Sequence, residues 1–324
     1  MSGISLHRYL ITGFSGFVAR HFVDYLEKTG EVCLVKGLDV QAPDFRFDQY
    51  KHVKIGFDQV DLLVKEPVED IVRVFQPTVI LHLASFSSVA LSWKEPVQSF
   101  RNNTNVFLHL IDSVRKLGMS VRILSVGSSE EYGNVQDEEL PLTEEHCLMP
   151  VSPYAVARVS QEYLSRIYAD GYGMDIVLTR SFNHIGPLQR DIFVVSSLAR
   201  QLVALKRSGK KRGAIVTGDV SIVRDFTDVR DVVRAYHLLM HQGRRGEVYN
   251  VCSGRGLSLK EIIEIMAGQL QLDVDITVDD RLIRPADNRK MIGSNEKIKH
   301  ELGWENTIPL EQSLQDMIRY WEAN

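Results

Sequence analysis

The fold is decided by a strand, a turn and a helix near the start of the chain, which have the sequence Arg8-Tyr9-Leu10-Ile11-Thr12-Gly13-Phe14-Ser15-Gly16-Phe17-Val18-Ala19. The first residues are mostly apolar and β-prone, and an amphipathic segment follows Ala19. The turn between them has the spacing Gly-x-x-Gly-x-x-Ala. Gly13 permits a tight bend, Gly16 lets backbone approach a pyrophosphate, and Ala19 lets helix and strand pack closely. The stretch therefore predicts a dinucleotide-binding turn.

Strand-like and helical segments alternate after this turn. The strand-like ranges are 32–39, 53–56, 79–85, 122–128 and 176–180, and the helical ranges are 68–75, 97–117 and the segment from residue 153. Such alternation is typical of a sheet with helices on both faces. We expect an α/β fold, a Rossmann-type doubly wound parallel sheet with a smaller α/β substrate-binding domain. The expected NAD-binding domain covers residues 1–180 and about 236–254, and the substrate-binding domain covers 181–235 and 255–324.

Bulk composition excludes several other classes of protein. The chain has 324 residues, a formal net charge of −4 and three cysteines. It is long enough to bury a full core, but it lacks the positive charge of a nucleic-acid binder. Cys33, Cys147 and Cys252 lack metal-ligand spacing, and no apolar run approaches the roughly 18 residues of a membrane span. We expect a soluble, cytoplasmic protein with no metal, no nucleic-acid partner and no membrane partner.

A carboxylate follows the second predicted strand, at Asp39. In a dinucleotide-binding unit, an acidic residue at this place accepts the hydroxyls of the adenosine ribose and repels a 2′-phosphate. The sequence therefore favours NAD(H) as the cofactor, with NADP(H) as the alternative. Asp61 and Leu62 follow the next strand, where they are expected to contact the adenine.

The chemistry is expected where a hydroxyl, a phenol and a cation meet. The predicted strand over 122–128 ends at Ser128, and a helix is expected to begin at Pro153. Tyr154 and Arg158 are one helical turn apart, so their side chains share a face. With Ser128 they form a set that can move a proton to or from an alcohol or carbonyl oxygen beside a hydride donor.

These motifs resemble the extended short-chain dehydrogenase/reductase family, which acts mainly on nucleotide sugars. The resemblance rests on the glycine-rich turn, on Leu81-His82-Leu83-Ala84, on the strand that ends at Ser128 and on the helix with Tyr154, and it covers essentially the whole chain. It implies that Ser128 is the catalytic hydroxyl and Tyr154 the proton donor. It also implies that Asn105 supports the proton relay.

One position departs from the family pattern Tyr-x-x-x-Lys, because the fourth residue after Tyr154 is Arg158. The family's lysine binds the nicotinamide ribose, and its charge stabilises a phenolate. Arginine keeps the charge but is planar and bulkier. We expect Tyr154 still to act as an acid; the alternative is a catalytically weak protein that binds NAD or a nucleotide sugar. The resemblance also implies a homodimer, packed through the helices that begin near Val97 and Pro153.

Later motifs narrow the resemblance. They are Arg122-Ile123-Leu124-x-x-Gly127-Ser128-Ser129-Glu130-Glu131-Tyr132-Gly133, the runs 182–187, 224–229 and 249–254, and Arg284-Pro285. Together they resemble enzymes that use NAD(P)H to reduce the C4 ketone of GDP-4-keto-6-deoxy-D-mannose to GDP-D-rhamnose. GDP-mannose 4,6-dehydratases are close relatives, and Glu130 matches their acid/base carboxylate. A dehydratase and a nucleotide-sugar epimerase therefore stay open as alternatives.

The candidate site residues fall into three sets. The catalytic set is Ser128, Tyr154, Arg158, Glu130 and Asn105. The cofactor set is Gly13, Phe14, Ser15, Gly16, Phe17, Val18, Asp39, Asp61, Leu62, Leu83, Ala84, Ser85, Tyr154 and Arg158. The set for the GDP-linked deoxysugar substrate is Ser129, Glu130, Asn183, Gln189, Phe193, Val194, Arg224, Arg284 and Asp287. His82, His184 and Trp304 are expected to shape the structure rather than to bind ligand.

Overall fold

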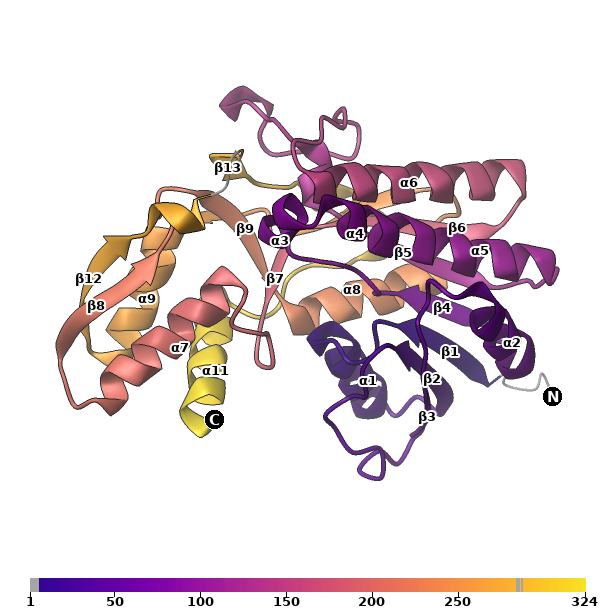
Figure 1. The fold of residues 1–324 in the computed structure, drawn as a ribbon, viewed down its shortest axis with the longest axis horizontal. Helices are drawn as coiled ribbons and strands as arrows, with labels where there is room; N and C mark the ends of the chain where they lie inside the picture. The colour runs from indigo at the N-terminus through magenta and orange to yellow at the C-terminus, as the bar shows by residue number, and fades with distance from the viewer. Residues whose placement is uncertain (1–5, 284–285, 287) are drawn as a thin grey trace. The chain divides into compact units, whose positions relative to one another are not determined.

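The computed structural model describes residues 6–283, 286 and 288–324, which form two compact units (Figure 1). Unit 1 comprises Met1–Glu131, Ser152–Arg180 and Val233–Tyr249, and unit 2 comprises Tyr132–Val151, Ser181–Val232 and Asn250–Asn324. This division differs from the expected domains, because 132–151 and 250–254 lie in unit 2 and 233–235 in unit 1. The physical reason for the first difference is one apolar cluster that joins Tyr132 and Leu142 to Phe182, Cys252 and Met291.

A seven-stranded sheet has the strand order β10-β6-β5-β4-β1-β2-β3. Its strands are β1 (His7–Thr12), β2 (Cys33–Asp39), β3 (Val53–Gln59), β4 (Val79–His82), β5 (Arg122–Ser128), β6 (Asp175–Ser181) and β10 (Val248–Val251). β1 pairs in parallel with β2 and β4, and the pairs β2–β3 and β4–β5 are also parallel. The expected doubly wound parallel sheet is thus confirmed. The expected strand over 79–85 ends early, at His82.

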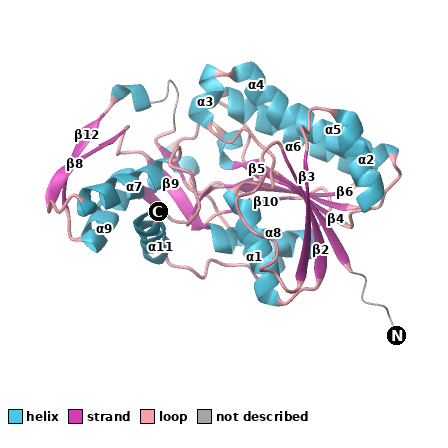
Figure 2. Ribbon diagram, turned by 60° about the horizontal axis from the view of Figure 1, so that its bottom comes forward, coloured by secondary structure: helices cyan, strands magenta, loops and turns pink. Residues whose placement is uncertain are grey.

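Helices cover both faces of this sheet. They are α1 (Phe17–Thr29), α2 (Lys65–Phe75), α3 (Val89–Lys94), α4 (Pro96–Phe100), α5 (Val106–Lys116), α6 (Pro153–Gly171) and the part of α8 (Val229–Gln242) that lies in unit 1. α2, α5 and α6 lie on one face and α1 and α8 on the other (Figure 2). Because both faces are covered, Leu10, Ile80 and Ile123 are fully buried. The helix expected over 97–117 is interrupted by a π-helix at Arg101–Asn105.

Among its described residues, unit 2 contains two small sheets and four α-helices of its own. β9 (Val223–Asp228) pairs with β7 (Asn183–Ile185), β11 (Gly256–Ser258) and β13 (Lys290–Met291), and β8 (Arg212–Thr217) pairs with β12 (Asp273–Val278). The helices are α7 (Val194–Arg207), α9 (Leu259–Leu270), α10 (Glu296–Leu302) and α11 (Leu310–Ala323). Leu202, Ile262 and Leu314 are buried together in its core. Trp304 is fully buried and donates to the carbonyl of Asp231 at 3.0 Å, so it anchors packing as expected.

Candidate active site

The turn between β1 and α1 has a backbone that only glycine accommodates. Gly13 has a φ of 70°, and a Cβ there would lie 2.7 Å from the backbone nitrogen of Ala84. That nitrogen donates to Thr12 Oγ1 at 3.2 Å, and the Leu83 nitrogen donates to the Thr12 carbonyl at 3.2 Å. The structure therefore brings the turn against two of the other candidate cofactor residues. α1 begins after Gly16 without a side-chain cap, so its positive dipole end faces this turn.

Asp39 is tied directly to the same turn. Its Oδ2 accepts a hydrogen bond from the backbone N–H of Ser15 at 2.9 Å, and its Oδ1 accepts from that of Gln41 at 3.3 Å. The Asp39 carbonyl accepts a hydrogen bond from the Val60 N–H at 2.8 Å, so Asp61, the next residue in the sequence, follows directly after this contact with the end of β2. The end of β2 and the turn thus form one polar rim.

Two side chains of the cofactor set lie in the core instead. The ring of Phe14 is fully buried, and a Cβ on Gly37 would come within 2.2 Å of it. Leu62 is buried among the apolar residues of the sheet. Each of these side chains fills a gap in the packing. Phe14 also donates its backbone N–H to the Leu38 carbonyl at 3.3 Å.

Tyr154 and Arg158 are in direct contact on α6, as the helical spacing predicts. Arg158 Nε donates to the Tyr154 hydroxyl oxygen at 3.1 Å. One terminal nitrogen donates to Gln161 Oε1 at 2.6 Å and to the Val126 carbonyl at 3.3 Å, and the other donates to Ser85 Oγ at 2.5 Å. Four partners from three segments therefore fix the guanidinium against the phenol.

The charge of Arg158 is buried without a carboxylate. Its exposed fraction is 5%, and among the described residues its hydrogen-bond partners are a phenol, a carbonyl, an amide and a hydroxyl. A buried cation without an anion is costly. Negative charge that develops on the Tyr154 oxygen, or on a ligand beside it, would relieve that cost. The arrangement is therefore suited to stabilise a phenolate.

Ser128 lies at the end of β5 in a loop held by the buried carboxyl group of Glu131. Its Oγ accepts from the backbone N–H of Glu130 at 3.2 Å, and its own N–H donates to Glu131 Oε1 at 2.6 Å. Burial, and then the neighbouring Glu162, raise the pKa of Glu131 well above its usual value. Glu162 is bound by Arg180, whose nitrogens donate at 2.8 and 2.9 Å. Glu130 is half-buried, and sequence reasoning missed the role of Glu131.

The candidate relay residue Asn105 ends the π-helix and is half-buried. The segment is held by its neighbours: Asn103 Oδ1 accepts from the Phe86 N–H at 2.9 Å, and Thr104 Oγ1 donates to the Ala157 carbonyl at 3.2 Å. π-helical turns are frequent at functional sites because they displace one residue from the regular spacing. The contact with Ala157 ties this segment to the helix that carries Tyr154.

A polar stripe beneath Arg158 was also missed from sequence. Gln161 Nε2 donates to Ser125 Oγ at 2.9 Å, and Ser165 Oγ donates to the same oxygen at 2.9 Å. Residues 154, 158, 161 and 165 follow helical spacing and so share a face. That run of polar side chains on an otherwise buried face was a signal available in the sequence. The hydrogen-bond partner of these side chains, Ser125 on the neighbouring strand, could not be identified from that pattern alone.

The candidate substrate residues of unit 2 differ in their burial and in their hydrogen-bond partners within the protein. Gln189 is buried; its Nε2 donates to the His184 carbonyl at 2.9 Å, but its Oε1 has no hydrogen-bond partner among the described residues. Arg224 is buried and donates to the Val223 and Asn288 carbonyls at 2.9 and 2.8 Å. Asn183 is the first residue of β7. Phe193 directly precedes α7, and Val194 is its first residue and is exposed. Ser129 belongs to unit 1 and is buried after the end of β5. Arg284 and Asp287 lie outside the described residues.

Two histidines are structural, as expected. His82 Nδ1 pairs with Thr12 Oγ1 at 2.9 Å, and burial, together with the charge of Arg158, lowers the pKa of His82 to about 3. His184 Nδ1 pairs with the Phe182 carbonyl at 3.2 Å, and burial lowers the pKa of His184 to about 4. Both rings are therefore neutral at physiological pH.

Comparison with known proteins gives consistent matches over nearly the whole chain. The family profile described as GDP-mannose 4,6 dehydratase matches residues 10–317. GDP-6-deoxy-D-mannose reductase from Pseudomonas aeruginosa is 32% identical over 316 residues, covering 98% of this chain and 97% of that protein. GDP-mannose 4,6-dehydratase from Yersinia enterocolitica is 24% identical, covering 97% and 93%.

Solved structures agree with these matches. The structure of RMD from Pseudomonas aeruginosa in complex with NADPH has a TM-score of 0.82 and 31% identity, and the match covers 98% of both chains. A UDP-glucose 4-epimerase from Thermus thermophilus in complex with NAD has a TM-score of 0.85 and 28% identity, covering 97% of this chain and 98% of that chain. The chain belongs to the GDP-mannose 4,6-dehydratase family, within the extended short-chain dehydrogenase/reductases, and is an oxidoreductase of that type. The resemblance drawn from its motifs is confirmed.

No helix among the described residues has both the length and the apolar character needed to cross a membrane.

Proposed function

We propose that this enzyme reduces the C4 ketone of GDP-4-keto-6-deoxy-D-mannose to GDP-D-rhamnose, using a nicotinamide dinucleotide. The observation that carries the proposal is the contact between Tyr154 and the buried, uncompensated charge of Arg158. The reductase from Pseudomonas aeruginosa supports the substrate, because its match covers nearly the full length of both chains. We further propose that unit 1 binds the cofactor and unit 2 the nucleotide sugar.

The residues of unit 1 fit a dinucleotide. Gly13 and Gly16 leave room for a pyrophosphate at the start of α1, since a Cβ on either would crowd the backbone. Asp39 carries negative charge beside that turn and already accepts the Ser15 N–H, which a 2′-phosphate would otherwise compete for. We therefore propose NAD(H) over NADP(H). An equal or higher kcat/KM with NADPH than with NADH would contradict this preference.

In the proposed mechanism the bound reduced nicotinamide supplies a hydride for C4. Tyr154 donates its phenolic proton to the C4 oxygen, which becomes the alcohol. The Arg158 charge stabilises the phenolate that remains, and Ser85 and Gln161 hold the guanidinium in place. Ser128 donates a hydrogen bond to the same substrate oxygen. The added hydride and proton together account for the two hydrogens that the product gains.

Gln189 supports a substrate role for its loop. Its Oε1 is buried and unpartnered among the described residues, while its Nε2 and backbone are held by neighbours. A buried acceptor without a donor is uncommon in native proteins, and a ligand hydroxyl or amide would satisfy it. The preceding residue, Leu188, has a φ of 70°, a strained conformation of the kind that concentrates at binding loops.

The proposal is tested by a paired assay on the purified full chain. One reaction contains GDP-mannose with NAD or NADP, and the other contains GDP-4-keto-6-deoxy-D-mannose with NADH or NADPH. Product mass and cofactor absorbance are followed in both. Oxidation of the cofactor with a gain of two hydrogens only in the second reaction supports the reductase. Absence of turnover there contradicts it.

The second candidate function is 4,6-dehydration of GDP-mannose. Glu130 favours it, because this half-buried carboxylate lies two residues after Ser128, and its backbone N–H donates to the Ser128 hydroxyl oxygen. A carboxylate there can remove or return a proton during loss of water. Water loss from GDP-mannose in the first reaction, abolished in Glu130→Gln, would establish it. An epimerase would instead interconvert two sugars without net consumption of cofactor.

We propose that the active form is a homodimer formed by two copies of α4 and α6. These helices present an apolar surface lined by Pro96, Val97, Phe100, Arg101, Pro153 and Val156. Val97 is 72% exposed, and Tyr163 and Ile167 extend the exposed apolar face along α6. Light scattering after size exclusion should give twice the chain mass. The double variant Val97→Asp with Val156→Asp should give the mass of one chain.

We also propose that the enzyme works in the cytoplasm. All three cysteines are free, and Cys33 and Cys252 are buried. Structural disulfides mark oxidising compartments, so free thiols fit a reducing one. Cell fractionation with a cytosolic marker enzyme tests this location, and recovery in the membrane or secreted fraction would contradict it.

A further inference from the structure

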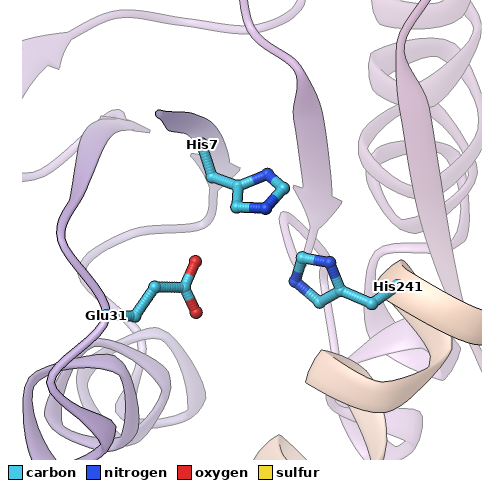
Figure 3. A group of neighbouring side chains, drawn as sticks. All are labelled: His7, Glu31 and His241. Carbon is cyan, nitrogen blue, oxygen red and sulfur yellow. The ribbon is translucent and has the colours of Figure 1, made fainter. Parts of the chain in front are cut away.

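A cluster of side chains with metal-binding chemistry lies in unit 1, at the end of β1 opposite the glycine-rich turn. His7 begins β1, Glu31 lies between α1 and β2, and His241 lies in the last turn of α8. Figure 3 shows their side chains directed toward one another. One ligand atom from each lies within 4.8 Å of the other two. The sequence analysis expected no metal, because these residues are brought together only by the fold.

The carboxylate of Glu31 is already held in place. The Tyr9 hydroxyl donates to its Oε1 at 2.7 Å, and His237 Nε2 bonds its Oε2 at 2.9 Å. The Tyr9 oxygen lies 2.8 Å from His241 Nε2. Tyr9 and His237 thus orient a negative charge toward the two imidazoles.

His7 is the least satisfied member of the cluster. Its ring lies edge-on to that of His241, with 4.8 Å between the ring centres, and it contacts the Tyr9 ring. Among the described residues, neither ring nitrogen of His7 has a hydrogen-bond partner, although the side chain is half-buried.

We propose that His7, Glu31 and His241 bind one divalent transition-metal cation of the zinc class, with water in the fourth position. Two imidazole nitrogens and one carboxylate oxygen are a ligand set that zinc commonly takes. Tetrahedral zinc needs ligand atoms about 3.3 Å apart, so the ligand atoms must approach one another by up to about 1.5 Å. All three side chains are half-buried, and rotation of the side chains would provide that movement.

The supporting residues have separate roles in this site. His237 bonds the carboxylate oxygen and so orients Glu31, as hydrogen-bonding partners of metal ligands commonly do. Tyr9 holds the other oxygen. The metal would join the start of β1, the segment before β2 and the end of α8, which are far apart in the sequence. Its role is therefore structural, because the candidate catalytic residues follow the opposite ends of the parallel strands.

The test uses the full chain without any histidine tag, after treatment with EDTA. Equilibrium dialysis with Zn²⁺ should give one ion per chain, and Co²⁺ should give the strong visible absorption of a four-coordinate site. His7→Gln and Glu31→Gln should each weaken Zn²⁺ binding about 100-fold, and His237→Gln about 10-fold. His52→Gln is the matched control, because His52 lies in the same unit and pairs with a different carboxylate, Glu27. It should bind Zn²⁺ as the wild type does.

A second measurement does not depend on the variants. A hundredfold excess of Zn²⁺ over its Kd should raise the Tm of the wild type by about 4 °C. The proposal is wrong if the wild type binds no stoichiometric Zn²⁺, if bound Co²⁺ shows only the weak spectrum of a six-coordinate ion, or if His7→Gln binds Zn²⁺ as tightly as His52→Gln. Each result is independent of catalytic turnover.

Discussion

Arg180 and Arg158 are both buried in unit 1, but they differ in whether a carboxylate compensates the positive charge. Arg180 is 3% exposed and donates two hydrogen bonds to the carboxylate of Glu162, at 2.8 and 2.9 Å. Arg158 is 5% exposed and binds neutral acceptors, including the Tyr154 phenol. Arg180 therefore belongs to a compensated ion pair, whereas Arg158 keeps its positive charge uncompensated among the described residues.

This difference separates a structural cation from a functional one. A buried pair contributes little net stability, but loss of one partner leaves the other charge buried alone. An isolated buried cation lowers stability by itself, so its retention points to a use. For Arg158 the proposed use is stabilisation of negative charge on Tyr154 and its ligand. The two arginines should therefore respond differently to the same substitution.

The largest expected effect is on stability, in Arg180→Met. Among the described residues, removing this guanidinium leaves Arg166, which is 37% exposed, as the cationic partner of Glu162, and the variant should lose about 3 kcal/mol of unfolding free energy. Urea denaturation measures it. Arg166→Met is the matched control, since it removes the exposed partner of the same carboxylate and should cost under about 1 kcal/mol. Equal losses in the two variants would show that Arg180 is not the compensating charge.

Arg158→Met should produce the opposite pattern. Removing an uncompensated cation should change the unfolding free energy by less than about 1 kcal/mol, while kcat should fall about 100- to 1000-fold. Steady-state kinetics and urea denaturation on the same preparation give both quantities. A folded variant with wild-type kcat would remove Arg158 from the mechanism. A stability loss as large as that of Arg180→Met would contradict the claim that the two arginines contribute differently to stability.

Arg158→Lys should have a smaller effect, a fall in kcat of about 10- to 100-fold. Lysine keeps the charge but is a point donor, so it cannot reach Tyr154, Gln161 and Ser85 together as the planar fork does. Steady-state kinetics measures the change. A large gain in turnover would instead mark Arg158 as a defect and favour the catalytically weak binding protein.

The smallest expected effect concerns His82, which lies in the field of Arg158. Burial and that charge lower the folded-state pKa of His82 to about 3, below the unfolded value of about 6.5. The unfolded state therefore binds the extra proton first, and stability is lost as pH falls below about 6.5. Between about pH 7.5 and 5.5, wild type should lose about 1.4 kcal/mol more than His82→Gln. Denaturation at several pH values measures this, and parallel curves for the two proteins would contradict it.

The sheet was predictable because its signals are local. The turn at Gly13 and the apolar run over 79–83 specify strands and a tight bend without distant partners. β8 was not among the expected strands. Its partner β12 lies sixty residues later in the chain, and pairing at that separation leaves no local signal.

The site was predictable to the same extent. Helical spacing placed Tyr154 and Arg158 on one face, and the structure confirms their contact. The π-helix was missed, because the bond from Asn103 to Phe86 that holds it joins separate segments. Ser85 was assigned to the cofactor, and its bond to the guanidinium was not foreseen, because it depends on a loop more than 70 residues away.

The central claim is that Tyr154 protonates a C4 oxygen while a hydride from the cofactor reaches C4. The most direct test supplies GDP-4-keto-6-deoxy-D-mannose with NADH that carries deuterium at the transferred position, and compares wild type with Tyr154→Phe. We expect wild type to form a product with one deuterium and one solvent hydrogen, and the variant to be slower by about 100-fold or more. A product without deuterium, or wild-type turnover in Tyr154→Phe, would contradict the account.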